Sequence, residues 1–181
     1  MIQLFWLRTD LRVADNTALS QALSNGPTVA VYLITPQQWL AHDDAPCKVD
    51  FWLRNLACLR EQLGKLNIPL LIRSCDDWQQ APVTLLQLSQ QIGAGAVHCN
   101  AEYGIHETRR DQACSSLLES QGIAFTAHFD QLLLKPGSVL TQSGNYFQVF
   151  SQFRKVCYQR LHRSLPACLP YPAAQAALPV S

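Results

Sequence analysis

Short hydrophobic runs alternate with amphipathic stretches along the first 130 residues. Runs of four to seven mostly apolar residues, bounded by turn residues, are typical of strands that are buried on both faces. Five such runs predict strands at residues 2–7, 29–34, 70–73, 96–100 and 123–129. The stretches between them carry helical spacing or helix-start residues. They predict helices at about residues 15–23, 46–66, 82–91 and 106–119.

The helix predicted at 46–66 has the clearest signals. Pro46 stands where helices often begin. Apolar residues then recur every three or four positions, which predicts one buried stripe. The stripe consists of Val49, Leu53, Leu56, Leu59, Leu63 and Leu66. For the first helix we predict Asp15 as the N-cap, and we expect residues 36–44 to form a long connection.

Strands that alternate with helices predict the fold class. We expect an α/β domain with a doubly wound, five-stranded parallel sheet and helices on both faces. Its core is predicted to span residues 1–130. Residues 131–164 read as an aromatic loop followed by a basic helix at about 149–161, and the Pro- and Ala-rich residues 165–181 as a linker or frayed end.

Composition narrows the possible partners. The chain has 181 residues, 48% of them hydrophobic, which is enough for one domain with a sizeable core. Only 15% are charged and the formal charge is +1, so there is no broad basic surface for nucleic acid. The 18 glutamines make the polar surface largely neutral. Such a surface is typical of a region covered by a second domain, and ordinary compositional drift explains it equally well.

The cysteines and the amino terminus indicate a compartment. Seven cysteines form no C-x-x-C pair, and an odd number predicts reduced, mostly buried thiols of a cytoplasmic protein. Residues 1–10 lack the features of a signal peptide. No apolar run reaches the roughly 18 residues of a membrane span, so no membrane partner is expected.

Several catalytic and phosphate-binding motifs are missing from the sequence. Neither G-x-G-x-x-G nor G-x-x-x-x-G-K-[ST] occurs, and there is no G-x-S-x-G or H-E-x-x-H. The five histidines are scattered. We therefore expect no metal site and assign no catalytic residue to this chain.

Candidate binding residues follow the predicted strands, because ligands of doubly wound sheets bind beyond the carboxyl ends of the strands. Arg8 and Asp10 follow the first strand and could clamp a ligand, or form internal ion pairs and a helix cap. Glu107 could complement a helix dipole or accept hydrogen bonds from a pterin-like ring. His42 could line the same pocket. Residues 154–163 hold four of the 14 basic residues. We interpret this cluster as a solvated helix face, or alternatively as a surface that contacts another domain or a phosphate.

Residues 6–16, WLRTDLRVADN, resemble the W-F-R-x-D-L-R-x-x-D-N opening of DNA photolyases and cryptochromes. Further similar segments follow in the same order over about residues 1–165. They are 35–39 with His42, 64–71, 102–103, 107–111 and 134–153. As a set these motifs are specific, and the resemblance implies a Rossmann-like α/β domain that supports an antenna chromophore. Leu7 departs from the family's usual Phe.

The resemblance also implies a cofactor site. In bacterial folate-type deoxyribodipyrimidine photolyases, a carboxylate matching Glu107 binds the pterin ring of methenyltetrahydrofolate, and residues matching His42 and His106 lie near it. A deazaflavin antenna would depend instead on Arg8, Asp10 and Arg12. The presence of the glutamate favours folate.

The family continues into a helical domain that binds FAD and receives the flipped-out pyrimidine dimer. The resemblance therefore implies a full-length enzyme that repairs cyclobutane pyrimidine dimers with blue light, whereas this chain alone is expected to be inactive. We expect it to reach damaged DNA only through that helical domain, and to self-associate through the uncovered interface. A cryptochrome photoreceptor, or a stand-alone module that binds a nucleotide or a protein, are the alternatives.

Overall fold

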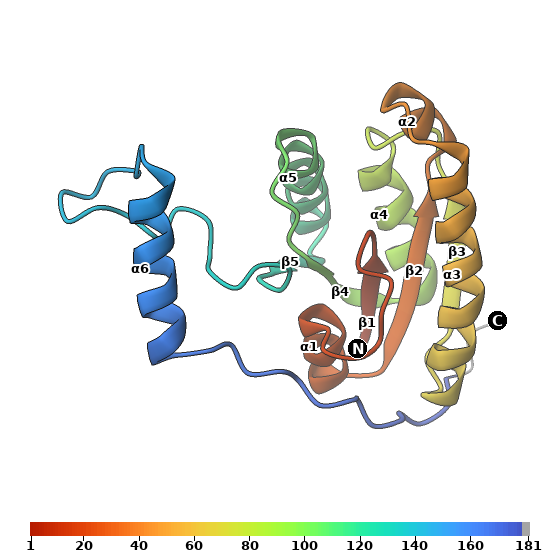
Figure 1. The fold of residues 1–181 in the computed structure, drawn as a ribbon. Helices are drawn as coiled ribbons and strands as arrows, with labels where there is room; N and C mark the ends of the chain where they lie inside the picture. Colours follow the sequence, from red (N-terminus) through yellow and green to blue (C-terminus); the bar gives the residue numbers. More distant parts are fainter. Residues whose placement is uncertain (179–181) are drawn as a thin grey trace.

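The computed structural model describes residues 1–178 and contains one five-stranded sheet (Figure 1). All its strand pairs are parallel, in the order β3-β2-β1-β4-β5. The strands are β1 (Ile2–Leu7), β2 (Thr28–Ile34), β3 (Leu70–Ser74), β4 (Ala94–Asn100) and β5 (Ala124–His128). The predicted fold class is therefore confirmed. Because the chain moves outward from β1 to β3 and then crosses to β4 on the other side, the strand order reverses between β1 and β4.

Helices cover both faces of this sheet (Figure 1). The helices of the described residues are α1 (Thr17–Asn25), α2 (Pro36–Ala41), α3 (Pro46–Lys65), α4 (Ala81–Ile92), α5 (Ile105–Ser120) and α6 (Phe150–Arg163), and of these α6 stands apart from the sheet. Helices α1 and α3 pack with Phe5 and Leu7 of β1 on one face. Helices α4 and α5 pack with Leu4 and Trp6 on the other. Alternate residues of β1 thus serve two separate hydrophobic cores, as a strand buried on both faces requires.

Two details at the helix starts correct the sequence predictions. The connection expected at 36–44 contains the short helix α2, whose first residue is Pro36. The N-cap of α1 is Asn16, not Asp15, because the Asn16 side chain accepts a hydrogen bond from the Leu19 amide at 3.0 Å. Asp15 has a φ of 48°, and its carboxylate accepts a hydrogen bond from the Leu169 amide instead.

The predicted stripe of α3 is buried only in its second half. Leu56, Leu59 and Leu63 are buried, whereas Leu53 is 42% exposed. At the carboxyl end of the sheet the first turns of α3 instead present Trp52 to a pocket. The cysteine prediction is also wrong in part, because all seven thiols are free but only Cys75, Cys99 and Cys114 are buried.

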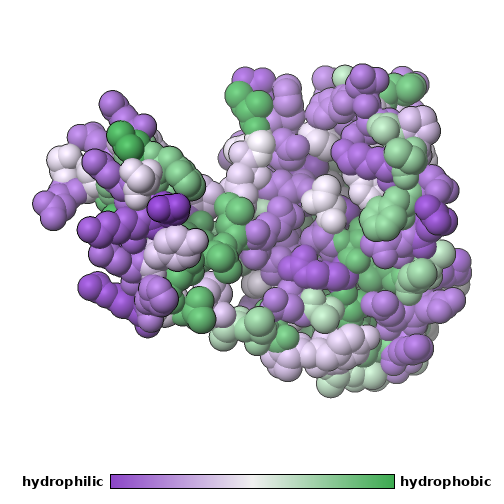
Figure 2. Space-filling view, viewed as in Figure 1, coloured by the Kyte–Doolittle hydropathy of each residue, from purple (hydrophilic) through white to green (hydrophobic). Residues whose placement is uncertain are grey.

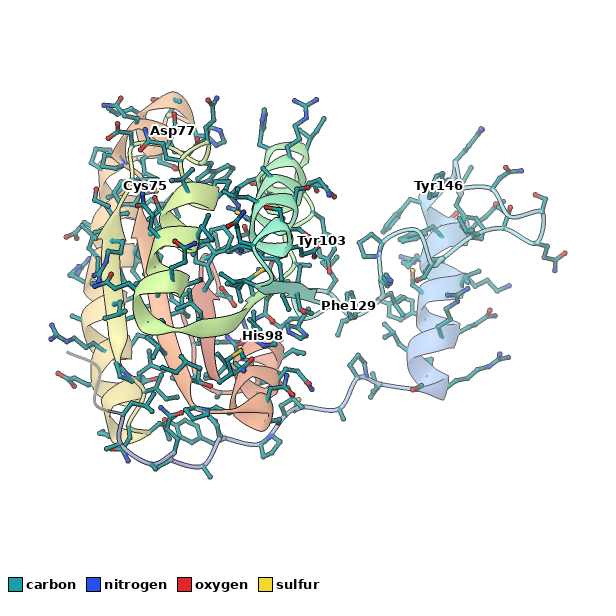
Figure 3. The ribbon with its side chains drawn as sticks, turned by 180° about the vertical axis from the view of Figure 1, so that it is seen from behind. Cys75, Asp77, His98, Tyr103, Phe129 and Tyr146 are labelled. Carbon is teal, nitrogen blue, oxygen red and sulfur yellow. The ribbon has the colours of Figure 1, made fainter. Side chains whose placement is uncertain are left out.

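Residues 131–163 form an arm that stands beside the rest of the fold, which we call the body (residues 1–130) (Figures 1 and 3). The arm consists of a loop and α6, and in Figure 3 it carries Tyr146, well separated from the sheet. The Arg160 guanidinium donates to the Ser138 carbonyl at 2.8 Å and ties the helix to the loop. The Phe147 and Phe153 rings lie 6.3 Å apart. The arm therefore holds its shape through contacts within itself.

After α6 the chain returns to the body (Figure 1). Residues 164–178 form neither helix nor strand. The Gln175 side chain accepts a hydrogen bond from the Thr28 amide at 2.7 Å and donates to the Thr28 carbonyl at 2.9 Å. Its backbone amide donates to the Leu66 carbonyl. This segment is thus anchored at the start of β2 and the end of α3. Among residues 1–178, no helix has the length and apolar character needed to cross a bilayer.

Candidate functional site

Two adjoining pockets lie at the carboxyl ends of the strands, around the point where the strand order reverses. The inner pocket has a volume of about 80 Å³ and receives residues from the ends of β1 and β2, from α2 and α3, and from the loops that follow β3 and β4. The rim pocket, of about 280 Å³, lies between α2, the loop after β3 and α5. Gln38, Trp78 and Arg110 line both. Ligands of doubly wound sheets bind in this position.

All four tryptophans of the chain line the inner pocket. Trp6 lies next to the last residue of β1, Trp39 lies on α2, Trp52 on α3 and Trp78 in the loop after β3. The Trp39 and Trp52 rings have centroids 6.1 Å apart. The Arg110 guanidinium lies between two indoles, 4.8 Å from the centroid of Trp6 and 4.7 Å from that of Trp78. The pocket therefore has flat aromatic walls and a fixed positive charge, which suit a planar heterocycle.

A buried ion network forms the floor of the inner pocket. Arg8 donates to the Asp111 carboxylate at 2.6 Å, and Arg110 donates to Asp111 and to Glu102, each at 2.8 Å. Thr9 donates to the other Glu102 oxygen at 2.6 Å. The side chains of both arginines are 4% exposed. Two buried cations thus face two buried carboxylates, which fixes the orientation of the arginines without side-chain freedom.

Titration behaviour follows from this network. Burial alone would raise the pKa of the Glu102 carboxyl, but Arg8 and Arg110 outweigh it and hold that pKa below its ordinary value. Burial, followed by Glu102 and Asp44, raises the pKa of the Tyr32 phenol to about 12. Glu102 is therefore a carboxylate at neutral pH, and Tyr32 keeps its proton and can donate it in a hydrogen bond.

One polar atom in the floor lacks a hydrogen-bond partner. The buried Nε of Arg8 makes no hydrogen bond within the described structure, and the nearest Glu102 oxygen is 3.5 Å away. Arg8 lines the inner pocket. Because unpaired buried donors are costly, an acceptor atom of a bound ring would be stabilised here. Arg8 was predicted from sequence as a candidate, and the structure places it at this pocket.

The two candidate histidines lie together where the two pockets meet. His42 follows α2 and lines the inner pocket, whereas His106, in the first turn of α5, lines the rim pocket. Their ring centroids are 5.7 Å apart, and His42 also lies edge-on to Trp78 at 5.3 Å. Gln38 is within 2.6 Å of the His42 Nε2. Residues 64 positions apart in sequence thus form one aromatic surface.

Glu107 and Asp10 line neither pocket. Glu107 lies in the first turn of α5, and its carboxylate folds back so closely over Gly104 that a Cβ there would overlap it. A carboxylate at this place complements the helix dipole. Asp10 accepts hydrogen bonds from the Arg8 amide at 3.1 Å and from the Asn100 side chain at 2.6 Å. It thereby ties the β1 loop to the end of β4.

The residues that sequence reasoning missed are the tryptophans, Glu102 and Arg110. Each tryptophan alone is typical of packing, and the four lie on four different elements, so no local pattern groups them. Glu102 and Arg110 gave a usable signal, since both follow the fourth predicted strand, as Arg8 follows the first.

Comparison with known proteins identifies the class. The family model described as DNA photolyase matches residues 3–173, and the chain belongs to this family. It is 43% identical over 155 residues to a deoxyribodipyrimidine photo-lyase of Vibrio cholerae, and this match covers 85% of the chain and 33% of the relative. The chain therefore spans about a third of the length of the curated relatives that it matches.

Solved structures agree with this assignment. A bacterial class III photolyase from Agrobacterium tumefaciens superposes with a TM-score of 0.76 at 27% identity, covering 98% of this chain and 35% of that one. A cryptochrome from Synechocystis gives a TM-score of 0.82 at 24% identity, covering 98% and 37%. The cryptochrome match shows a shared fold.

Proposed function

We propose that this chain is the antenna domain of a deoxyribodipyrimidine photolyase. The observation that carries the proposal is the convergence of four tryptophans and the unpartnered Arg8 Nε on a pocket at the strand-order reversal. An antenna chromophore, when bound, absorbs light and passes its excitation to a flavin. In the full-length protein that flavin would be FAD in a helical domain, and the repair of cyclobutane pyrimidine dimers would take place there.

Methenyltetrahydrofolate is our proposed chromophore, held in the rim pocket. The inner pocket, at about 80 Å³, is smaller than the roughly 300 Å³ at which pockets for drug-sized molecules begin. The rim pocket, at about 280 Å³, is close to that size and is lined by His106 and Trp78. The pterin ring would pack on these two side chains, with Glu107 one residue along α5 as the expected carboxylate partner.

A deazaflavin in the inner pocket is the second candidate. Arg8 favours it, because Arg8 lines that pocket and its buried Nε has no hydrogen-bond partner within the described structure. Binding of a three-ring chromophore there would require Trp39 or Trp78 to move, because these indoles enclose the space.

A spectroscopic titration of the full chain tests the two proposals. Methenyltetrahydrofolate is followed by its near-ultraviolet absorbance against wild type, His106→Ala, Glu107→Gln and Trp52→Phe. Rim binding predicts that His106→Ala and Glu107→Gln each weaken binding by about tenfold, the effect of one lost hydrogen bond or ring contact. Trp52 lines only the inner pocket, so Trp52→Phe should change the affinity for methenyltetrahydrofolate by less than about twofold.

If instead a deazaflavin binds tightly, and Trp52→Phe weakens its binding more than His106→Ala or Glu107→Gln does, the inner pocket is the chromophore site. If wild type binds neither chromophore up to about 1 mM, this chain does not form an antenna site by itself.

A further inference from the structure

The tryptophans and the tyrosines of the chain are distributed differently. All four tryptophans line the inner pocket, although they come from four different elements. Of the five tyrosines, all within residues 1–178, only Tyr32 lines it. Among the same described residues, Trp6 is the one tryptophan that also belongs to a hydrophobic core. The indoles are therefore gathered around one small space rather than spread through the cores. Figure 2 shows the mixed hydrophobic and hydrophilic surface of one side of the molecule, over which no comparable aromatic cluster is needed for packing.

The four indoles form two close pairs. Trp39 and Trp52 have ring centroids 6.1 Å apart, with their planes tilted by 44°. Trp6 and Trp78 are joined through the Arg110 guanidinium, which lies 4.8 Å from the first ring centroid and 4.7 Å from the second. Both pairs line the same pocket. Excited indoles exchange energy through dipole coupling, whose rate falls with the sixth power of the distance, and separations as short as these favour the exchange.

Charged neighbours hold these rings in fixed orientations. Arg110 donates to two buried carboxylates at 2.8 Å each, so the cation between Trp6 and Trp78 cannot turn. The Lys48 Nζ lies 4.7 Å from the ring centroid of Trp52. Because the rings are held, the angles between their transition dipoles stay constant. The coupling between neighbouring indoles is therefore a property of the fold.

Trp78 connects this cluster to both candidate chromophore sites. It lines the inner pocket and the rim pocket, and Trp6, Trp39 and Trp52 line the inner one. A ring bound in either pocket therefore lies against at least one indole and close to the others. A conjugated ring that absorbs near-ultraviolet light accepts energy from an excited indole, because indole emission overlaps that absorption.

We propose that the four indoles act together as an ultraviolet antenna for the chromophore of this domain. Each indole absorbs ultraviolet light, exchanges the excitation with its neighbours and passes it to the bound ring. No bond forms and no electron or proton moves, because the indole returns to its ground state as the ring becomes excited. The inference rests on the proposed antenna function, and it adds the indole absorption band to the light that the domain can use.

Polarised fluorescence of the full chain without chromophore tests the exchange between indoles. In a rigid glycerol glass the rings cannot rotate, so only energy transfer depolarises their emission. The reference is the triple variant Trp39→Phe, Trp52→Phe and Trp78→Phe, in which Trp6 is the remaining indole. At the indole absorption maximum, the wild-type anisotropy should be about half that of the triple variant or less. Excitation at the long-wavelength edge, where transfer between like fluorophores fails, should raise it towards that of the triple variant.

Sensitised emission tests the delivery of energy to the ring. The chain is saturated with methenyltetrahydrofolate or, if that does not bind, with a deazaflavin. The excitation spectrum of the bound ring should then contain an added indole band that the free ring lacks, with a matching loss of indole emission. Trp39→Phe with Trp52→Phe should remove about half of this added band, because it removes two of the four indoles. Tyr146→Phe alters an exposed ring of the arm and should leave the band unchanged.

Two results would overturn the proposal while leaving the antenna function intact. One is a wild-type anisotropy equal to that of the triple variant at both excitation wavelengths, which would mean that the indoles emit independently. The other is a bound ring whose excitation spectrum matches that of the free ring, because a loss of indole emission would then be quenching without transfer. If absorbance titrations show that neither chromophore binds, the antenna function is contradicted, and this inference fails with it.

Discussion

The body and the arm solve the problem of stability in different ways. Of the buried hydrophobic residues in the described chain, all but Val139 lie in the body. The arm instead exposes large apolar side chains, among them Tyr146 and Phe150, at 75% and 71%. The body is therefore stabilised by burial of its own apolar side chains. The arm relies on a few local contacts and leaves apolar surface exposed, where another molecule or domain could pack.

The same contrast holds for polar groups. In the body, Asp10, Asn16 and Asn100 are buried and bonded to one another, which fixes the loop after β1 against the end of β4. In the arm, the donors of α6 face solvent. Rigid positioning suits a site that must orient a ring, whereas the exposed donors of the arm leave its polar surface open to solvent.

The largest expected effect tests the difference in burial. Leu63 of α3 is fully buried in the hydrophobic core that also contains Phe5 and Leu7 of β1. Leu63→Ala should therefore lower the free energy of unfolding by about 2 to 5 kcal/mol. Phe150→Ala removes a larger but exposed side chain of the arm and should cost less than about 0.5 kcal/mol. Urea titration of both variants measures this. Similar losses would mean that the arm is part of the cooperative core.

Sequence reasoning predicted the body well because its signals are local. Strands buried on both faces read as short apolar runs, and the terminal residues of β1, β2 and β4 differ from the observed ones by two residues or fewer. The short helix α2 was missed because its six residues, PQQWLA, are too few to show a period. Asp15 and Asn16 are both good N-cap residues, and it is the hydrogen bonds joining Asn16 to Asp10 and Asn100 that hold the Asn16 side chain inward.

The candidate site was less predictable because it depends on distant pairs. Arg8 and His42 could be named from their places after strands, and both line the inner pocket. The stacking of Arg110 between Trp6 and Trp78 joins three elements and leaves no sequence signature. Glu107 followed from a resemblance to a family motif, and its role as a chromophore partner stays a prediction.

An intermediate effect concerns the segment that returns from the arm to the body. Gln175→Ala removes both hydrogen bonds to the backbone of Thr28, which is fully buried. Leaving one buried amide and one carbonyl unpaired should lower the free energy of unfolding by about 1 to 2 kcal/mol. Gln142→Ala, an exposed position in the arm, is the control and should be within about 0.5 kcal/mol of wild type. If both variants match wild type in urea titrations, the anchor does not contribute to stability.

The smallest expected effect is a pH dependence that belongs to the body alone. His98 of β4 and His128 of β5 stack with ring centroids 5.2 Å apart, and the His98 Nδ1 lies 2.9 Å from the His128 Nε2. The other His98 nitrogen is 3.0 Å from the Gln3 side-chain oxygen. With both ring nitrogens of His98 engaged, the pair is satisfied only while one of the facing nitrogens remains an unprotonated acceptor.

Burial lowers the pKa of both imidazoles, and the neighbouring ring lowers that of His98 further. Their folded-state pKa values therefore lie below the unfolded value of about 6.5, so the unfolded chain binds protons first as the pH falls. Stability should be fully present above about pH 7 and decline as the pH drops through the unfolded pKa towards the folded ones. In urea titrations from about pH 8 to pH 5, His128→Gln should reduce this decline, whereas His162→Gln on the exposed face of α6 should leave it unchanged. If His162→Gln reduced the decline of stability with falling pH as much as His128→Gln does, protonation in the arm, and not only in the body, would contribute to the pH dependence of the free energy of unfolding.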